Sequence, residues 1–348
     1  MSAPFRRLPL LATFGLLIGA AQAQPAPLPA VGQAAASRVA STPGYDFHSD
    51  FWLNLHDYLY GVVGGGPGDA ALPEEGTDCL AALPAEQAAP WNEALAFYRD
   101  AMAERHHRRD PLVRTLRYRL SGLVPGEPEA EFEALMDLLR GAAPAYRACL
   151  WDAHDARNRA RVDELVALLE RHARPIQQAL AEAYRSPWPE AVRADVVSFS
   201  NYAGASTASG PGLPPHTMFS STDPDTGGLS GLELLLHEAS HAMFGPRHGA
   251  VSEAFHAAAD AQQRPMPSGL WHAVSFYTSG EAVREAAAEA GLTYEPYALR
   301  VGLFERAFEG YLDPLRQHWQ PYLDGAVSLE EAALGVIGAI PSSEGSEG

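Results

Sequence analysis

The chain has 348 residues, 47% of them hydrophobic, and a formal net charge of -18 at pH 7. It contains no lysine, so arginine supplies every fixed positive side chain. This charge argues against nucleic acid as a partner, because binding to phosphates requires a basic surface. It argues equally against anionic lipid.

The first residues predict an export signal. In MSAPFRRLPLLATFGLLIGAAQA, residues 1–23, two arginines precede an apolar run, and small residues follow it. This is the order of a secretory signal peptide cut after Ala23. A membrane anchor is the alternative, but the run is shorter than the roughly 20 residues that span a bilayer. We therefore expect a periplasmic or secreted protein that is not inserted in the membrane after cleavage.

The rest of the chain divides by composition. Residues 24–44 predict a flexible linker, 45–190 a helical N-terminal region, 191–340 a region that mixes strands and helices, and 341–348 a disordered polar tail. Cys79 and Cys149 are the only cysteines. In an exported protein such a pair favours a disulfide, with two buried free thiols as the alternative.

The expected elements follow from the spacing of apolar residues. Spacings of three and four predict helices at 47–63, 90–109, 130–141 and 145–185, the last bent or interrupted at Pro175. Alternation predicts strands at 195–207 and 215–224. Helices resume at 231–244, 251–263, 268–290, 296–318 and 328–337. The pattern predicts a predominantly helical α+β fold with a small sheet beside the helix at 231–244.

That helix contains the sequence HEASH, in which His237 and His241 are four residues apart. Side chains four apart project from the same face, so both imidazoles can reach one Zn²⁺. Glu238 lies beside them and is the expected general base for a water whose pKa zinc lowers. Ser230 and Glu233 fit a capping box at the helix start. The alternative is a buried helix with two histidines and no metal.

A catalytic zinc site of this type needs a third protein ligand. The extended pattern H-E-x-x-H-x-x-G-x-x-H is absent, because Gly245 falls one residue late. We expect the third ligand to be Glu281, with Glu253 and His272 as alternatives.

HEASH followed by WHAVSFYTSGE resembles the gluzincin class of zinc metallopeptidases, and in particular a poorly characterised bacterial metallopeptidase-like group. The resemblance covers about residues 195–286. It implies a zincin-like catalytic region at 191–340, zinc on His237, His241 and Glu281, and Glu238 as the base.

Other residues are candidates for substrate contacts. Tyr277, four before Glu281, shares its helical face and is the expected donor to the oxyanion, while His272 is a candidate for substrate binding. The resemblance also implies an extended substrate beside an edge strand. HTMFSS, 216–221, is the natural edge strand, which makes His216 and Met218 candidates as well.

The sequence therefore predicts an exported zinc metallopeptidase that acts on a peptide or protein. A zinc amidase acting on a non-peptide or cell-wall amide is one alternative. A non-catalytic helical scaffold with a vestigial zinc site is the other. The oligomeric state is left open.

Overall fold

The computed structural model describes residues 28–32, 37–64, 76–105, 110–123, 130–200, 204–210 and 213–341. The predicted signal peptide and the predicted tail after residue 341 lie outside these ranges. Among the residues described, no helix combines the length and apolar character that crossing a membrane requires.

The fold is α+β and predominantly helical, which confirms the predicted class. Its sheet has the strand order β1-β2-β3-β5-β4. Neighbours β2 and β3 are parallel, as are β3 and β5, while the outer strands β1 and β4 run antiparallel to their neighbours. The strands are β1 Arg38–Thr42, β2 Tyr45–His48, β3 Val192–Val197, β4 Ala205–Gly210 and β5 Leu213–Ser220.

Three predictions that concern the sheet need correction. Arg38–Thr42 falls in the expected linker, yet it forms β1, which turns at Gly44 (φ 91°) and pairs with β2. The single strand expected at 195–207 is divided between β3 and β4. Because β5 lies between them, β4 and not 216–221 is the edge strand on this side of the sheet.

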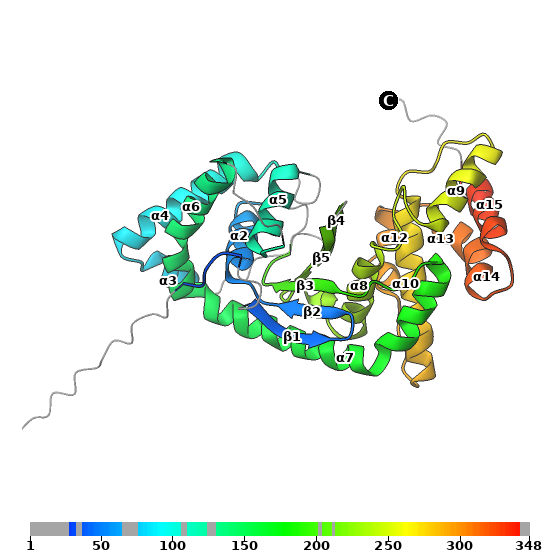
Figure 1. Cartoon of the computed structure of the whole chain (residues 1–348), viewed down its shortest axis with the longest axis horizontal. Coiled ribbons are helices and arrows are strands. Elements are labelled where there is room, and N and C mark those ends of the chain that lie inside the picture. Colours follow the sequence, from blue (N-terminus) through cyan, green and yellow to red (C-terminus); the bar gives the residue numbers. More distant parts are fainter. Residues whose placement is uncertain are drawn as a thin grey trace, which may run out of the picture.

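The helices between β2 and residue 152 form one half of the molecule (Figure 1). Their apolar side chains share one core, in which Leu53, Leu59 and Tyr98 are fully buried. A disulfide between Cys79 and Cys149, with Cα atoms 5.5 Å apart, confirms the predicted pairing. The elements are α2 Phe51–Val62, α3 Thr77–Ala81, α4 Ala85–Phe97, η1 Tyr98–Met102, α5 Pro111–Leu120, α6 Ala130–Tyr146 and η2 Arg147–Trp151.

Helix α7, Asp152–Tyr184, runs beneath the sheet and connects the two halves (Figure 1). Its first turns bury His154 and Asn158 beside the N-terminal helices, whereas its later turns belong to a second core. Pro175 does not interrupt the helix, which bends along its second half in Figure 1.

The second half contains the remaining helices. The single helix expected at 296–318 is broken into short pieces, because Gly302 (φ 67°) and Gly310 (φ 80°) adopt left-handed conformations that end helical turns. The elements are η4 Pro224–Thr226, α8 Gly228–Ser240, α9 Ala250–Ala261, α10 Leu270–Glu289, α11 Tyr297–Arg300, α12 Leu303–Arg306, α13 Leu312–Pro314, η5 Leu315–Trp319, α14 Gln320–Leu323 and α15 Leu329–Ala339.

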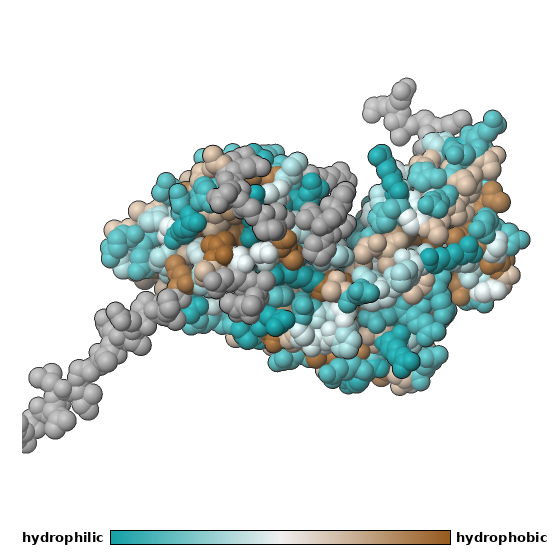
Figure 2. Space-filling view, viewed as in Figure 1, coloured by the Kyte–Doolittle hydropathy of each residue, from teal (hydrophilic) through white to brown (hydrophobic). Residues whose placement is uncertain are grey.

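The two faces of the sheet differ in character. Phe47, Val196 and Phe219 belong to the core shared with α7 and α8. Val197 and Met218 face the opposite way, into the core of the N-terminal helices. The sheet therefore separates two hydrophobic cores, and the surface is hollowed between the two halves (Figure 2).

Candidate metal centre

Three histidines from two helices meet at one point. His237 and His241 at the end of α8 and His272 at the start of α10 each offer a ring nitrogen, and these atoms lie within 4.8 Å of one another. The Nε2 atoms of His237 and His272 are 3.2 Å apart. Nitrogens bound tetrahedrally to one zinc at 2.0–2.1 Å are about 3.3 Å apart. This group could therefore hold a metal ion.

Packing between α8 and α10 brings the histidines together. In α8, Leu232, Leu235 and Leu236 are fully buried, and in α10 Ala273 and Val274 are buried in the same core. The two helices make direct contact. His237 is therefore buried, whereas His241 and His272 are half-buried and leave one side of the group open toward solvent.

The start of α8 differs from the expected capping box. The helix begins at Gly228, so Ser230 lies inside it and accepts a hydrogen bond from Arg300. Glu233 instead accepts hydrogen bonds from the hydroxyl of Tyr294 and the backbone amide of Tyr297. These bonds connect α8 to Tyr294 and to the first residue of α11.

Aromatic rings hold the imidazoles in place. Phe276 stacks on His237 with ring centroids 3.8 Å apart, and Trp271 stacks on His272 at 4.7 Å. Trp271 also presents its edge to His241 at 5.5 Å. These contacts restrict the ring rotations and keep water away from part of the group.

The surroundings of two imidazole nitrogens show that the group suits a metal. Nδ1 of His237 lies 3.2 Å from Oγ of Ser275, which leaves Nε2 directed at the other histidines. Nε2 of His241 is buried and has no hydrogen-bond partner among the described residues. A buried polar atom without a partner is costly. A metal ion would satisfy it, so the donor set fits.

Glu238 lies beside this group. It is 5% exposed, and its Oε2 lies 3.2 Å from Nδ1 of His241. This oxygen accepts no hydrogen bond from the described residues. A buried carboxylate oxygen therefore lies against one imidazole of the group.

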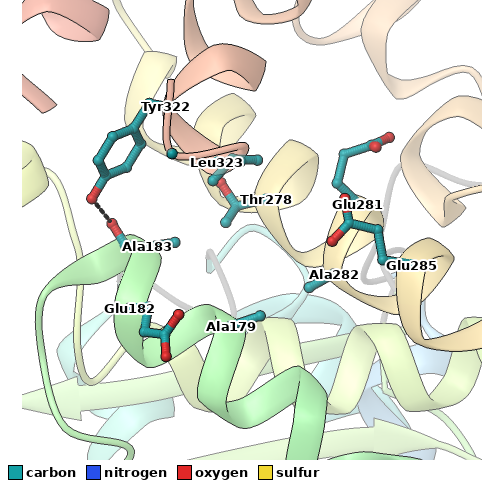
Figure 3. Close-up of a pocket in the computed structure, with 10 residues that line it drawn as sticks. Ala179, Glu182, Ala183, Thr278, Glu281, Ala282, Glu285, Tyr322 and Leu323 are labelled. Carbon is teal, nitrogen blue, oxygen red and sulfur yellow. Dashed lines mark hydrogen bonds between the residues drawn. The ribbon is translucent and has the colours of Figure 1, made fainter. Parts of the chain in front are cut away.

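The prediction of Glu281 as the third ligand needs correction. Nine residues of helix separate it from His272, which is about 13 Å along the axis. Its carboxylate binds the guanidinium of Arg284 at 2.5 Å instead. Glu281 lines a different pocket, of about 340 Å³, together with Glu182 and Tyr322 (Figure 3). His272 takes its place in the metal group, and the other alternative, Glu253, is exposed on α9.

Tyr277 is also directed elsewhere. Its hydroxyl donates a hydrogen bond to the side-chain oxygen of Gln320, at 2.8 Å, and burial together with the nearby carboxylate of Glu281 raises its pKa above the usual value. The preceding residue, Phe276, is the one that contacts His237. The structure therefore does not place Tyr277 as a donor at the histidines.

The predicted substrate residues of β5 lie inside the protein. His216 and Met218 are 0% and 2% exposed on the sheet face that meets the N-terminal helices. Nε2 of His216 is 2.7 Å from the carboxylate of Asp195, and its ring packs against Tyr118. Both side chains line a small cavity of about 20 Å³ with Arg117 and Ser206, and their part in substrate binding stays a prediction.

Sequence reasoning overlooked three residues of this centre: Ser275, Phe276 and Trp271. A signal for Phe276 is present, because it lies four residues after His272 and must share its helical face. No pattern in the sequence identifies Ser275, whose role depends on how α10 packs against α8.

Comparison with protein-family models, with curated proteins and with solved structures finds no match to this chain.

Proposed function

We propose that this chain is a zinc-dependent hydrolase that cleaves peptide bonds, with His237, His241 and His272 as ligands and Glu238 as general base. The convergence of three imidazoles beside a buried carboxylate without a hydrogen bond on Oε2 carries the proposal. Three protein ligands with an open fourth position are typical of catalytic rather than structural zinc sites.

The donor types favour zinc. Imidazole also suits copper, nickel and iron, but a three-histidine set with one open position is a common arrangement for hydrolytic zinc. When bound, zinc supplies Lewis acidity, which lowers the pKa of a coordinated water toward about 7 and polarises a carbonyl oxygen.

Glu238 moves the proton in this proposal. Its carboxylate takes a proton from the attacking water and delivers it to the leaving amine nitrogen. The side chain supports this role by its place beside the group, since its Oε2 lies 3.2 Å from Nδ1 of His241 and makes no hydrogen bond within the described residues. Phe276 and Trp271 keep the neighbouring imidazoles fixed while the proton moves.

The edge strand β4 supports a peptide as the substrate. It pairs only with β5 among the described strands and lies in contact with α8. An extended peptide can add to such an edge through backbone hydrogen bonds. The resemblance of HEASH and the α10 sequence to zinc metallopeptidases points to the same bond, although a third histidine departs from the gluzincin ligand set.

We also propose that the protein works outside the cytoplasm. Residues 1–23 have the order of a signal peptide, and the Cys79–Cys149 disulfide suits an oxidising compartment.

Metal content and peptide cleavage test the proposal together. We expect about one zinc per chain by mass spectrometry of metals, and cleavage of a mixed peptide library by the wild type. Glu238→Gln should retain zinc and lose about 10²- to 10⁴-fold in rate. Glu253→Gln, which makes the same change to an exposed carboxylate on α9, is the matched control and should behave as wild type.

Two results would contradict the proposal. If the wild-type protein binds no metal when zinc is supplied, it is not a zinc-dependent hydrolase. If the protein hydrolyses non-peptide amides but leaves peptides uncleaved, it is a zinc amidase and not a peptidase.

A further inference from the structure

Ser275 of α10 lies directly behind the first histidine. Its Oγ is 3.2 Å from Nδ1 of His237, on the side of the ring opposite the Nε2 that approaches His272. Both Ser275 and His237 are 0% exposed. This contact is therefore shielded from water.

Ser275 is also held from its other side. The hydroxyl of Tyr184, at the end of α7, donates a hydrogen bond to the backbone oxygen of Ser275 at 3.4 Å. Tyr184 is fully buried, and its ring stacks on Phe244 just after the metal helix. Helix α7 thus fixes the turn of α10 that carries Ser275.

The chemical consequence concerns the tautomer of His237. A neutral imidazole carries its proton on one nitrogen and binds a metal with the other. If Nδ1 carries the proton, it can donate to Oγ of Ser275 and leave the lone pair of Nε2 free. A hydrogen bond of this kind fixes the orientation of a ligand and increases its basicity.

We propose that Ser275 is a positioning residue of the metal centre, whose Oγ accepts a hydrogen bond from Nδ1–H of His237 and so selects Nε2 as the metal-binding atom. This inference rests on the metal centre of the proposed function. A structural role is the alternative, because a serine hydroxyl inside a helix often bonds to the carbonyl of the preceding turn.

Zinc affinity separates these roles. The purified full chain is stripped of metal and titrated with zinc against a chromophoric chelator, and separately with Co²⁺ to record its visible absorption. Ser275→Ala should weaken zinc binding about 10- to 100-fold and change the Co²⁺ spectrum. Ser275→Thr retains the hydroxyl and should bind as wild type.

Ser279→Ala is the matched control. Ser279 is equally buried on the same helix, but it lies one turn further along, about 6 Å from Ser275 in axial position. The same loss of a hydroxyl there should leave zinc affinity and the Co²⁺ spectrum unchanged. Equal affinity in Ser275→Ala and wild type, or equal losses in both alanine variants, would overturn the inference.

A measurement on the wild type covers the case in which Ser275→Ala fails to fold. Nitrogen-15 NMR of the zinc-loaded protein reports which nitrogen of His237 carries the proton. We expect the proton on Nδ1, and a proton on Nε2 would overturn the inference. A wild type that binds neither zinc nor Co²⁺ would instead overturn the proposed function on which it rests.

Discussion

The Nε2 atoms of His237 and His272 lie 3.2 Å apart, although 35 positions separate the two residues in the sequence. Helix α9 and its flanking loops return the chain so that the start of α10 meets the end of α8. The metal centre therefore depends on the packing of two helices as well as on the HEASH spacing.

This relationship predicts which substitutions remove the metal. His272→Ala should lose zinc from the purified protein, because only two imidazoles remain and the affinity falls with the number of ligands. Glu281→Ala should retain it, since the carboxylate of Glu281 is bound to Arg284. Mass spectrometry of metals measures the zinc content of both variants. If Glu281→Ala lost zinc and His272→Ala kept it, Glu281 would be the third ligand.

The disulfide predicts a loss of stability that leaves the candidate metal centre intact. Replacement of both Cys79 and Cys149 by serine should lower the free energy of unfolding by about 2–4 kcal/mol, because the unfolded chain gains freedom over a 70-residue separation. Urea unfolding measures the change. A reducing agent should weaken the wild type similarly and leave the double variant unaffected. Zinc content should not change, because the bond joins α3 to η2 in the N-terminal core.

Glu233 predicts a pH dependence with a definite sign. Burial raises the pKa of its carboxyl from 4.5 to about 7, against the opposing hydrogen bonds from Tyr294 and Tyr297. The folded protein therefore keeps a proton that the unfolded chain releases. The stabilisation from this proton is complete below about pH 4.5 and is lost as the pH rises through about 7.

Glu233→Gln should remove this contribution. Urea unfolding between about pH 5 and pH 8 should show a shallower decline of stability in the variant than in the wild type. The comparison is made with a chelator present, because metal binding has its own pH dependence. Parallel curves for the two proteins would show that Glu233 is ionised throughout this range.

Asp195 predicts the opposite trend. Burial alone raises its pKa, but Arg193 and His216 together hold the pKa well below its usual range. Its stabilisation is therefore present above about pH 4 and is lost as the pH falls further. Asp195→Asn leaves the guanidinium of Arg193 buried without its counter-charge and should cost about 3–5 kcal/mol in urea unfolding at neutral pH.

Asp225→Asn provides the control for that experiment. Asp225 pairs with Arg300 at the surface, where both side chains are more than a third exposed. Exposed pairs contribute about 0–1 kcal/mol, so the control should lose little. A loss at Asp195 no larger than at Asp225 would mean that water reaches the buried pair.

The sequence was sufficient for the parts of the site that depend on local periodicity. The four-residue spacing places His237 and His241 on one face, and the long apolar patterns locate α7 and α10. The sequence did not favour His272 over Glu281 as the third member of the group, because nine residues separate the two and only one of them can face α8. Tertiary packing decides which, and no local pattern records it.

The sheet was harder to predict for a related reason. Strands β1 and β2 have five and four residues, too few to show a clear alternation. His216 and Met218 alternate as expected for a strand, but the order of strands determines which face of β5 is covered. That order depends on contacts between segments more than a hundred residues apart, such as β2 with β3.

Helix α7 makes the two halves a single folding unit. Val162, Leu165, Ile176 and Leu180 fill the core around α8, while His154 at the start of the same helix packs against Tyr58 and Tyr146 of the other half. A fragment that begins after Tyr184 would keep all three histidines and yet lack one wall of their support. Proteolysis at the junction between α7 and β3 should therefore release no stable half, and expression of the metal-bearing segment alone should give an insoluble chain.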